Sequence, residues 1–337
     1  MLKLKFRGLR ASFNNFAFVL ALAGALIITT VLPAGAASAQ SSGAQANGFV
    51  ISPVKSEITV RKGQSQNVQL SVENPTLVKT TVKAVVNDFV ASNDESGTPR
   101  LILNNKTPLP ANNFKTLVNN IPEIKLAPNQ KQYINVTISV PASANSGGYY
   151  GAIRFAPANV SQKSNVGLTA SAGSLFLVTV PGNLTEKANL VQLSAAGASG
   201  NASSFLTSGK VSVLARLKNV GNIQVKPFGK IRVIGTFGHQ VASFEFNSSG
   251  GDILPASTRK FVKQLKHQSW FGRYRITANL AYQNGGGSLI NASSTFYYFP
   301  VWFLIVVAVV ILIIIGLIYR LATRKSRRPK PKSGKKA

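Results

Sequence analysis

The 337-residue chain contains no cysteine, only two histidines, and nine acidic residues against 38 lysines and arginines. The absence of cysteine excludes disulfides and thiolate metal sites, so an exported domain of this chain must be held together by its hydrophobic core. The histidines, His239 and His267, are not spaced as metal ligands, and neither a carboxylate pair nor a nucleophile motif indicates catalysis. The sequence therefore predicts a protein that is not an enzyme, with no metal and no cofactor.

The longest uncharged run is apolar and lies near the C-terminus, from Val301 to Tyr319. As an α-helix it would measure about 28 Å, close to the hydrocarbon thickness of a bilayer, and aromatic residues stand at both ends. A buried helix of a soluble protein would normally have a polar face, which this run lacks. Nine lysines and arginines and no acidic residue follow it. We therefore predict a single-pass transmembrane helix at 300–319 and a basic cytoplasmic tail at 320–337 that binds anionic lipid.

The N-terminal segment has the features of a secretory signal peptide. Basic residues precede an apolar stretch from Phe16 to Val31, and Ala37-Ser38-Ala39 forms a small-residue cleavage site. We expect a signal peptide at 1–39 and a polar linker at 40–48; the alternative is a second, retained membrane helix. In either case the middle of the chain would lie outside the cell, anchored in the cell membrane.

This middle region is strongly basic. Of the 38 lysines and arginines, four lie in the signal peptide and nine in the tail, while all nine acids lie between them, so the exported part carries a net charge of +16. Such a surface attracts polyanions, and outside a bacterial cell these are teichoic acids and anionic headgroups rather than nucleic acid. A solvated basic surface with no specific ligand is the alternative.

The pattern of the exported region predicts β-structure throughout. Short runs such as Tyr133–Val140 alternate apolar and polar residues with period two, and Gly, Pro and Asn turns separate them, with a loop-rich stretch at 90–120. About seven or eight strands precede Pro181 and about seven follow it. The predicted fold is all-β: two tandem immunoglobulin-like β-sandwiches, at 49–183 and 187–298, followed by the transmembrane helix.

The two halves repeat three short landmarks in the same order. They are a strand ending in Asn74 or Asn219, a turn with Pro128 or Pro255, and a Gly-x-Tyr step read as Gly148-Tyr149-Tyr150 and Gly272-Arg273-Tyr274. A tyrosine at this step would bond back to the loop before it, as in the tyrosine corner, or would be an ordinary core aromatic.

Several longer segments carry a family resemblance. The first half contains ISPVKSEITVRKGQSQNVQLSVENPT and LAPNQKQYINVTISVPASANSGGYYGAIRF, and the second contains LKNVGNIQVKPFGKIRVIG and WFGRYRITANLAY before YYFP and the apolar run. This order resembles the WxL-interacting surface proteins of Gram-positive bacteria. The resemblance implies that the first module contacts peptidoglycan and that the second contacts a host or partner protein.

Three groups of residues are candidates for binding. An aromatic residue near a cation is a frequent interface type, which singles out Trp270, Phe271 and Arg273. Alternation on one strand would place three cations on one face, as a ladder for phosphates, and two tyrosines after a Gly-Gly pair would present rings to a sugar. These further candidates are Lys226, Lys230 and Arg232, and Tyr149 and Tyr150. The alternatives are core packing for the aromatic residues and a solvated strand face for the cations.

We therefore predict a membrane-anchored surface protein that binds cell-wall polymer, either peptidoglycan or teichoic acid, or a surface protein partner. One alternative is an assembly or scaffolding factor that holds another exported chain by β-strand addition. Another is a structural spacer with no ligand of its own.

Overall fold

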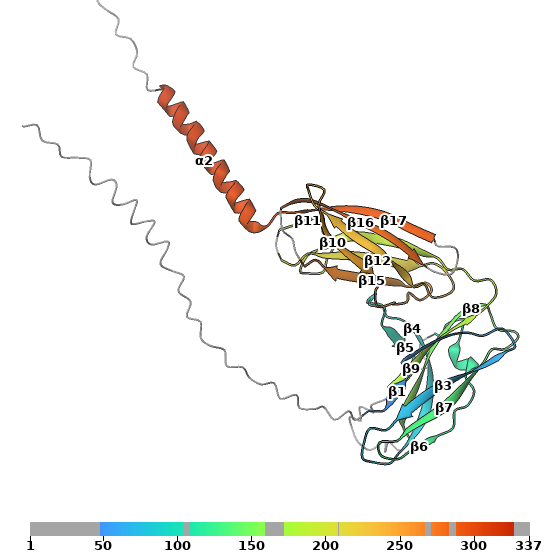
Figure 1. The fold of residues 1–337 in the computed structure, drawn as a ribbon. Helices are drawn as coiled ribbons and strands as arrows, with labels where there is room; N and C mark the ends of the chain where they lie inside the picture. Colours follow the sequence, from blue (N-terminus) through green and yellow to red (C-terminus); the bar gives the residue numbers. More distant parts are fainter. Residues whose placement is uncertain are drawn as a thin grey trace, which may run out of the picture. The chain divides into compact units, whose positions relative to one another are not determined.

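The computed structural model describes residues 48–103, 108–158, 172–207, 209–266, 271–282 and 288–326. The predicted signal peptide, nearly all of the predicted linker and most of the basic tail lie outside these residues. Figure 1 shows that the described chain consists of β-strands followed by one long helix. The predicted all-β class is therefore confirmed.

The first sandwich has two sheets, one ordered β1-β3-β7 and the other β2-β9-β8-β4-β5, with β6 paired to β4. Its strands are β1 (Val50–Ser52), β2 (Lys55–Thr59), β3 (Ser65–Glu73), β4 (Thr80–Ala91), β5 (Pro99–Leu101), β6 (Ile124–Leu126), β7 (Lys131–Ser139), β8 (Gly147–Pro157) and β9 (Ala172–Val180). Apolar residues that alternate with polar ones meet between the sheets, including Val136, Ile138, Phe155 and Phe176, each 0% exposed. The alternation predicted for β7 is thus the pattern that buries it.

The second sandwich also has two sheets, ordered β10-β12-β15 and β11-β17-β16-β13-β14. Its strands are β10 (Ala188–Ala196), β11 (Phe205–Leu206), β12 (Ser212–Asn219), β13 (Pro227–Ile234), β14 (Gln240–Phe246), β15 (Thr258–Gln264), β16 (Gly272–Tyr282) and β17 (Ser288–Tyr298). Strand β16 shows the period of two most clearly. Tyr274, Ile276, Ala278, Leu280 and Tyr282 are buried, and the residues between them are more exposed.

The stretch at 90–120, predicted to be rich in loops, contains regular structure. Strand β4 continues to Ala91, β5 pairs with it, and a 3₁₀ helix η1 (Phe114–Leu117) buries both of its terminal side chains in the first core. The Oδ1 atom of Asp88 accepts a hydrogen bond from the Phe114 amide at 2.6 Å. These elements are too short to show a period in the sequence, which is why the pattern did not predict them.

The predicted asparagine landmark is the same structural device in both sandwiches. Asn74 is 0% exposed, and its Nδ2 donates to the carbonyl oxygens of Val78 and Ala127 at 2.8 and 3.1 Å. Asn219 is also 0% exposed and donates to two loop carbonyl oxygens at 2.7 and 2.8 Å. Each asparagine thus joins two loops at one end of its sandwich by satisfying buried backbone acceptors.

The Gly-x-Tyr landmark is also repeated, but the sequence alignment was wrong by one residue. Gly147 and Gly272 open their strands with φ of 134° and 127°, a region that favours glycine. Tyr149 and Tyr274, two residues later, both lie in the main cores. The true step is therefore Gly147-x-Tyr149, and the Gly-Gly pair concealed it because either glycine fits the pattern. Tyr150 points to the opposite face of β8.

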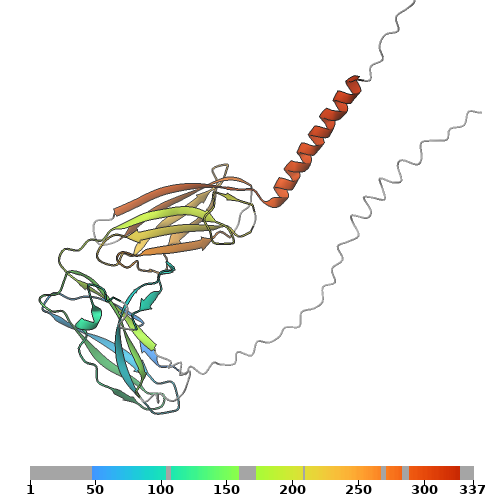
Figure 2. The same ribbon diagram turned by 180° about the vertical axis from the view of Figure 1, so that it is seen from behind.

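Helix α2 (Val301–Ser326) follows β17 directly, as Figure 2 shows from behind. Its segment Val301–Thr323 is long and apolar enough to cross a membrane. The helix runs past the predicted end at 319 because arginine, leucine and alanine continue the sequence there and are good helix formers.

Candidate functional site

A cleft of about 930 Å³ lies where the two sandwiches meet. One wall is made by the end of β4, the turn after it and residues 110–112 of the first sandwich, and the other by residues 254–258 of the second. Ligand sites in proteins have this size and are mostly apolar with a few polar groups.

The floor of the cleft is apolar because β8 is buried on both of its faces. On its outer face Tyr150 packs against Phe89, with ring centroids 6.1 Å apart, and Leu177 of β9 joins this cluster. Leu254 of the second sandwich packs against the same cluster. The two sandwiches therefore share a small second core, and the cleft opens beside it.

Polar groups surround this floor. Arg100 and Asn93 are exposed, and the Nδ2 of Asn112 donates to the Gly148 carbonyl at 3.2 Å. The Gly148 amide donates in turn to the Asn222 carbonyl of the second sandwich at 3.0 Å. The rim thus offers amide and guanidinium donors that suit carboxylate and amide oxygens of a ligand.

Tyr150 also ties the sandwiches together through its hydroxyl group. This hydroxyl donates to Oε1 of Gln224 at 2.9 Å, and the Gln224 amide lies 3.5 Å from Oγ1 of Thr179. Burial raises the pKa of Tyr150 well above its ordinary value. The phenol therefore stays protonated and keeps its role as donor.

An ion pair closes one side of the cleft. Nε of Arg216 donates to Oε2 of Glu95 at 2.6 Å, and Nη2 of Arg216 contacts Oε1 of Glu95. The Lys260 amide donates to the Glu95 carbonyl at 2.7 Å. The hydrogen bond from Arg216 is the largest cause that lowers the pKa of Glu95, so this carboxylate is ionised at neutral pH.

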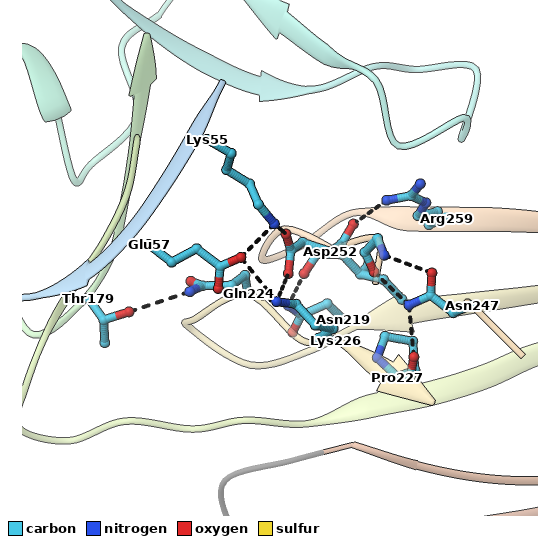
Figure 3. Close-up of polar contacts among 12 residues, drawn as sticks. Lys55, Glu57, Thr179, Asn219, Gln224, Lys226, Pro227, Asn247, Asp252 and Arg259 are labelled. Carbon is cyan, nitrogen blue, oxygen red and sulfur yellow. Dashed lines mark hydrogen bonds and ion pairs between the residues drawn. The ribbon is translucent and has the colours of Figure 1, made fainter. Parts of the chain in front are cut away.

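A second ionic network joins the sandwiches away from the cleft and is drawn in Figure 3. Lys55 lies 2.5 Å from Glu57 and 2.9 Å from Asp252, and Lys226 contacts the same two carboxylates at 3.0 and 3.8 Å. Partial burial raises the pKa of Glu57, but the two lysines outweigh it and the net pKa is lowered. Three of the nine acids of this basic chain, Glu57, Asp252 and Glu95, thus form ion pairs where the sandwiches meet.

The predicted sugar-binding role of Tyr149 is contradicted by its position. Its ring is 5% exposed in the first core, and its hydroxyl donates to the Asn145 carbonyl at 3.0 Å, four residues earlier. This bond back to the preceding loop is the one expected of a tyrosine corner. Tyr150 is 9% exposed and contributes part of the cleft floor, so packing is its main role.

The predicted cation ladder is shorter than expected. Lys226 precedes β13 and turns to Glu57 and Asp252, so it does not join the ladder. Lys230 and Arg232 are exposed on β13, and Lys230 pairs with Glu245 of β14 at 3.2 Å. Glu245 on the neighbouring strand thus neutralises Lys230, one of the two cations that remain for binding phosphate.

The third predicted group is separated from the cleft and lies beside the helix. Phe271 stacks on Phe303 of α2 with centroids 3.8 Å apart, and Arg273 is exposed at the start of β16. Trp270 and His267 lie outside the described residues. Sequence reasoning missed Phe89, Arg100 and Asn112, because no motif marks them and only the tertiary fold brings them together.

Comparison with known proteins finds a family match in part of the first sandwich. Residues 57–157 match the family model described as WxL Interacting Protein, peptidoglycan binding domain. This match contains β4, β5 and residues 110–112, and so all of the first-sandwich wall of the cleft. No curated protein matches the chain.

Solved structures resemble the chain only distantly. The chaperone–tip adhesin complex of CFA/I fimbriae is 11% identical, with a TM-score of 0.38, over 72% of this chain and 98% of that one. The class 5 fimbriae chaperone CfaA is 12% identical, with a TM-score of 0.35, over 74% and 99%. The E. coli chaperone DraB is 13% identical, with a TM-score of 0.34, over 74% and 95%. These likenesses concern the fold only.

Proposed function

We propose that this chain is a non-enzymatic surface protein of the WxL-interacting family, whose peptidoglycan-binding domain residues 57–157 match, and that it binds peptidoglycan in the cleft described above. We also propose that α2 anchors it in the cell membrane, with residues 40–300 outside and the basic tail inside. The signal peptide at 1–39 would direct its export.

The observation that carries the proposal is that the family domain supplies the apolar floor and polar rim of the cleft. Peptidoglycan offers N-acetyl groups and lactyl methyl groups that suit the accessible apolar lining of the cleft, which includes Ala91, Pro110 and Leu254 above the buried Phe89 and Tyr150. Its stem peptide offers carboxylates and amides that suit Arg100 and Asn112. Leu254 would place the second sandwich in contact with the same ligand.

The test is sedimentation of the full chain, in detergent, with purified cell-wall sacculi from which teichoic acid has been removed. Ala111→Trp places a large side chain on an exposed lining position, and we expect the affinity to fall about tenfold or more, which corresponds to about 1.4 kcal/mol. Arg100→Glu reverses a rim charge and should lower it about fivefold, given about 1 kcal/mol for an exposed charge pair.

The matched control is Lys125→Glu, which makes the same change in charge at the one exposed position of β6, away from the cleft. It should leave binding unchanged. Equal losses in Arg100→Glu and Lys125→Glu would show that net charge alone attracts the wall. Binding that disappears together with teichoic acid would refute peptidoglycan as the ligand.

A further inference from the structure

The second sandwich has one end that adjoins the helix. Gly272, at the start of β16, lies opposite Tyr298, the last residue of β17, and α2 begins at Val301. Ile234 lies opposite Arg275, so the turn between β13 and β14 is at the same end. We call this the helix-proximal end, and it comprises residues 205–206, 210, 235–239, 263–266, 271–275 and 297–303.

Aromatic side chains gather at the helix-proximal end. Phe303 of α2 stacks on Phe271 and lies 5.9 Å from Phe299, whose ring is 5.6 Å from Phe205. These rings connect the first turn of the helix to β11 and to the start of β16. Phe237, at the tip of the β13–β14 turn, is 78% exposed. A phenylalanine on an exposed hairpin tip, near other aromatic residues and cations, suits the headgroup region of a membrane, where aromatic rings are enriched.

The acidic residues of the second sandwich are unevenly distributed, and its helix-proximal end carries only positive charge. Five basic residues lie at the helix-proximal end, and among the described residues no acid does. The basic residues are Lys210, Lys263, Lys266, Arg273 and Arg275. The three acids of this sandwich lie elsewhere: Glu186 before β10, Glu245 opposite Lys230, and Asp252 at the contact with the first sandwich.

We propose that the helix-proximal end is a membrane-docking surface, in which Phe237 inserts among anionic phospholipid headgroups and Arg273 and Arg275 bind their phosphates. The inference rests on the proposed anchoring by α2, and it adds that the sandwich lies against the bilayer surface instead of pivoting freely on the helix. The occupant follows from continuity with the helix, which would hold the bilayer beside this end, and from charge complementarity. Thr236 supports the geometry, since its Oγ1 donates to the Arg273 carbonyl at 3.1 Å and fixes the hairpin to β16.

The absence of cysteine makes a clean experiment possible. His239→Cys places a single fluorophore on the exposed hairpin next to Phe237, and Ser248→Cys places the same fluorophore on an exposed loop after β14, away from the helix. Each full chain is reconstituted in nanodiscs that contain phosphatidylglycerol and headgroup spin-labelled lipid. We expect strong quenching at position 239, little at 248, and loss of the difference in phosphatidylcholine discs or in high salt.

Variants of the surface residues test the contacts themselves. Arg273→Ser and Arg275→Ser should each lower the docking constant from quenching about fivefold, and Phe237→Ser should also lower it. Circular dichroism should show these variants folded, because all three side chains are exposed. Equal quenching at 239 and 248, or quenching at 239 that the variants leave unchanged, would overturn the proposal. Displacement by soluble polyglycerol phosphate but not by salt alone would also overturn it, in favour of a teichoic acid site. If the chain fails to enter nanodiscs, the anchoring itself is wrong, which is a separate outcome.

Discussion

The repeated asparagine leads to a sharp prediction about stability. Asn219 is 0% exposed, its Nδ2 donates to the carbonyls of Ile223 and Ile253 at 2.7 and 2.8 Å, and its Oδ1 accepts from the Gly221 amide at 2.8 Å. Asn219→Ala would leave the Ile223 carbonyl and the Gly221 amide without their partner, while the Ile253 carbonyl keeps the Val225 amide at 3.0 Å. At about 1–3 kcal/mol for each buried unsatisfied group, and with partial relaxation, we expect a loss of about 2–4 kcal/mol. Domains of this size are stable by only about 5–15 kcal/mol, so the effect is large.

The assay is urea and thermal unfolding of the full chain in detergent, followed by circular dichroism. The transition of the second sandwich should move down by roughly 10–20 °C, while that of the first should stay in place. Asn189→Ala, at an exposed position on β10 in the same sandwich, is the matched control and should change stability by less than about 0.5 kcal/mol. A loss below about 1 kcal/mol for Asn219→Ala would contradict this prediction, since it would mean that water or other groups satisfy the Ile223 carbonyl and the Gly221 amide.

Three further predictions concern single contacts. Tyr149→Phe removes the hydrogen bond to the Asn145 carbonyl and should destabilise the first sandwich by about 1 kcal/mol in thermal unfolding. Unchanged stability would mean that this hydrogen bond does not stabilise the sandwich. Burial raises the pKa of Asp88, so the folded protein binds this proton more readily than the unfolded chain does. Stability should therefore increase as pH falls through the folded pKa towards the unfolded pKa. In Asp88→Asn this pH dependence should be absent from urea titrations. The hydrogen bond from Arg216 lowers the pKa of Glu95, so the ion pair stabilises the fold fully above about pH 4.3 and this stabilisation is lost as pH falls through the folded pKa. The free energy of unfolding of the wild type should exceed that of Glu95→Gln by about 0.5–1 kcal/mol above this window, and the difference should shrink within it. A difference that does not change with pH would contradict the ion pair.

The fold could be predicted because its physics is local. A strand such as β16 alternates buried and exposed residues over its whole length, and that alternation is visible in the letters. The two-fold repeat of the sandwich could be predicted for the same reason, because turn glycines and the repeated asparagines are local features of the sequence. The alignment of Tyr149 failed because two adjacent glycines satisfy one pattern, and only the backbone angle of Gly147 separates them.

The cleft could not be predicted, because none of its residues has a distinctive neighbour in the sequence. Phe89 looks like any strand aromatic, and Leu254 like any core leucine. They come together only because Glu95 and Tyr150 reach across to Arg216 and Gln224, more than 70 residues away in the chain. Lys226 shows the converse. Its spacing suggested a surface ladder, but the nearest carboxylates, contributed by distant segments, draw it to the contact between the sandwiches.

Hydrogen–deuterium exchange of the full chain in nanodiscs would test whether peptidoglycan binds in the cleft. Exchange would be measured with and without a purified disaccharide-peptide fragment of the wall. If peptidoglycan binds in the cleft, we expect protection in three segments that line it, 89–95, 110–112 and 254–258, with β6 and β7 unchanged. Protection confined to other surfaces, or binding with no protection in these segments, would contradict it.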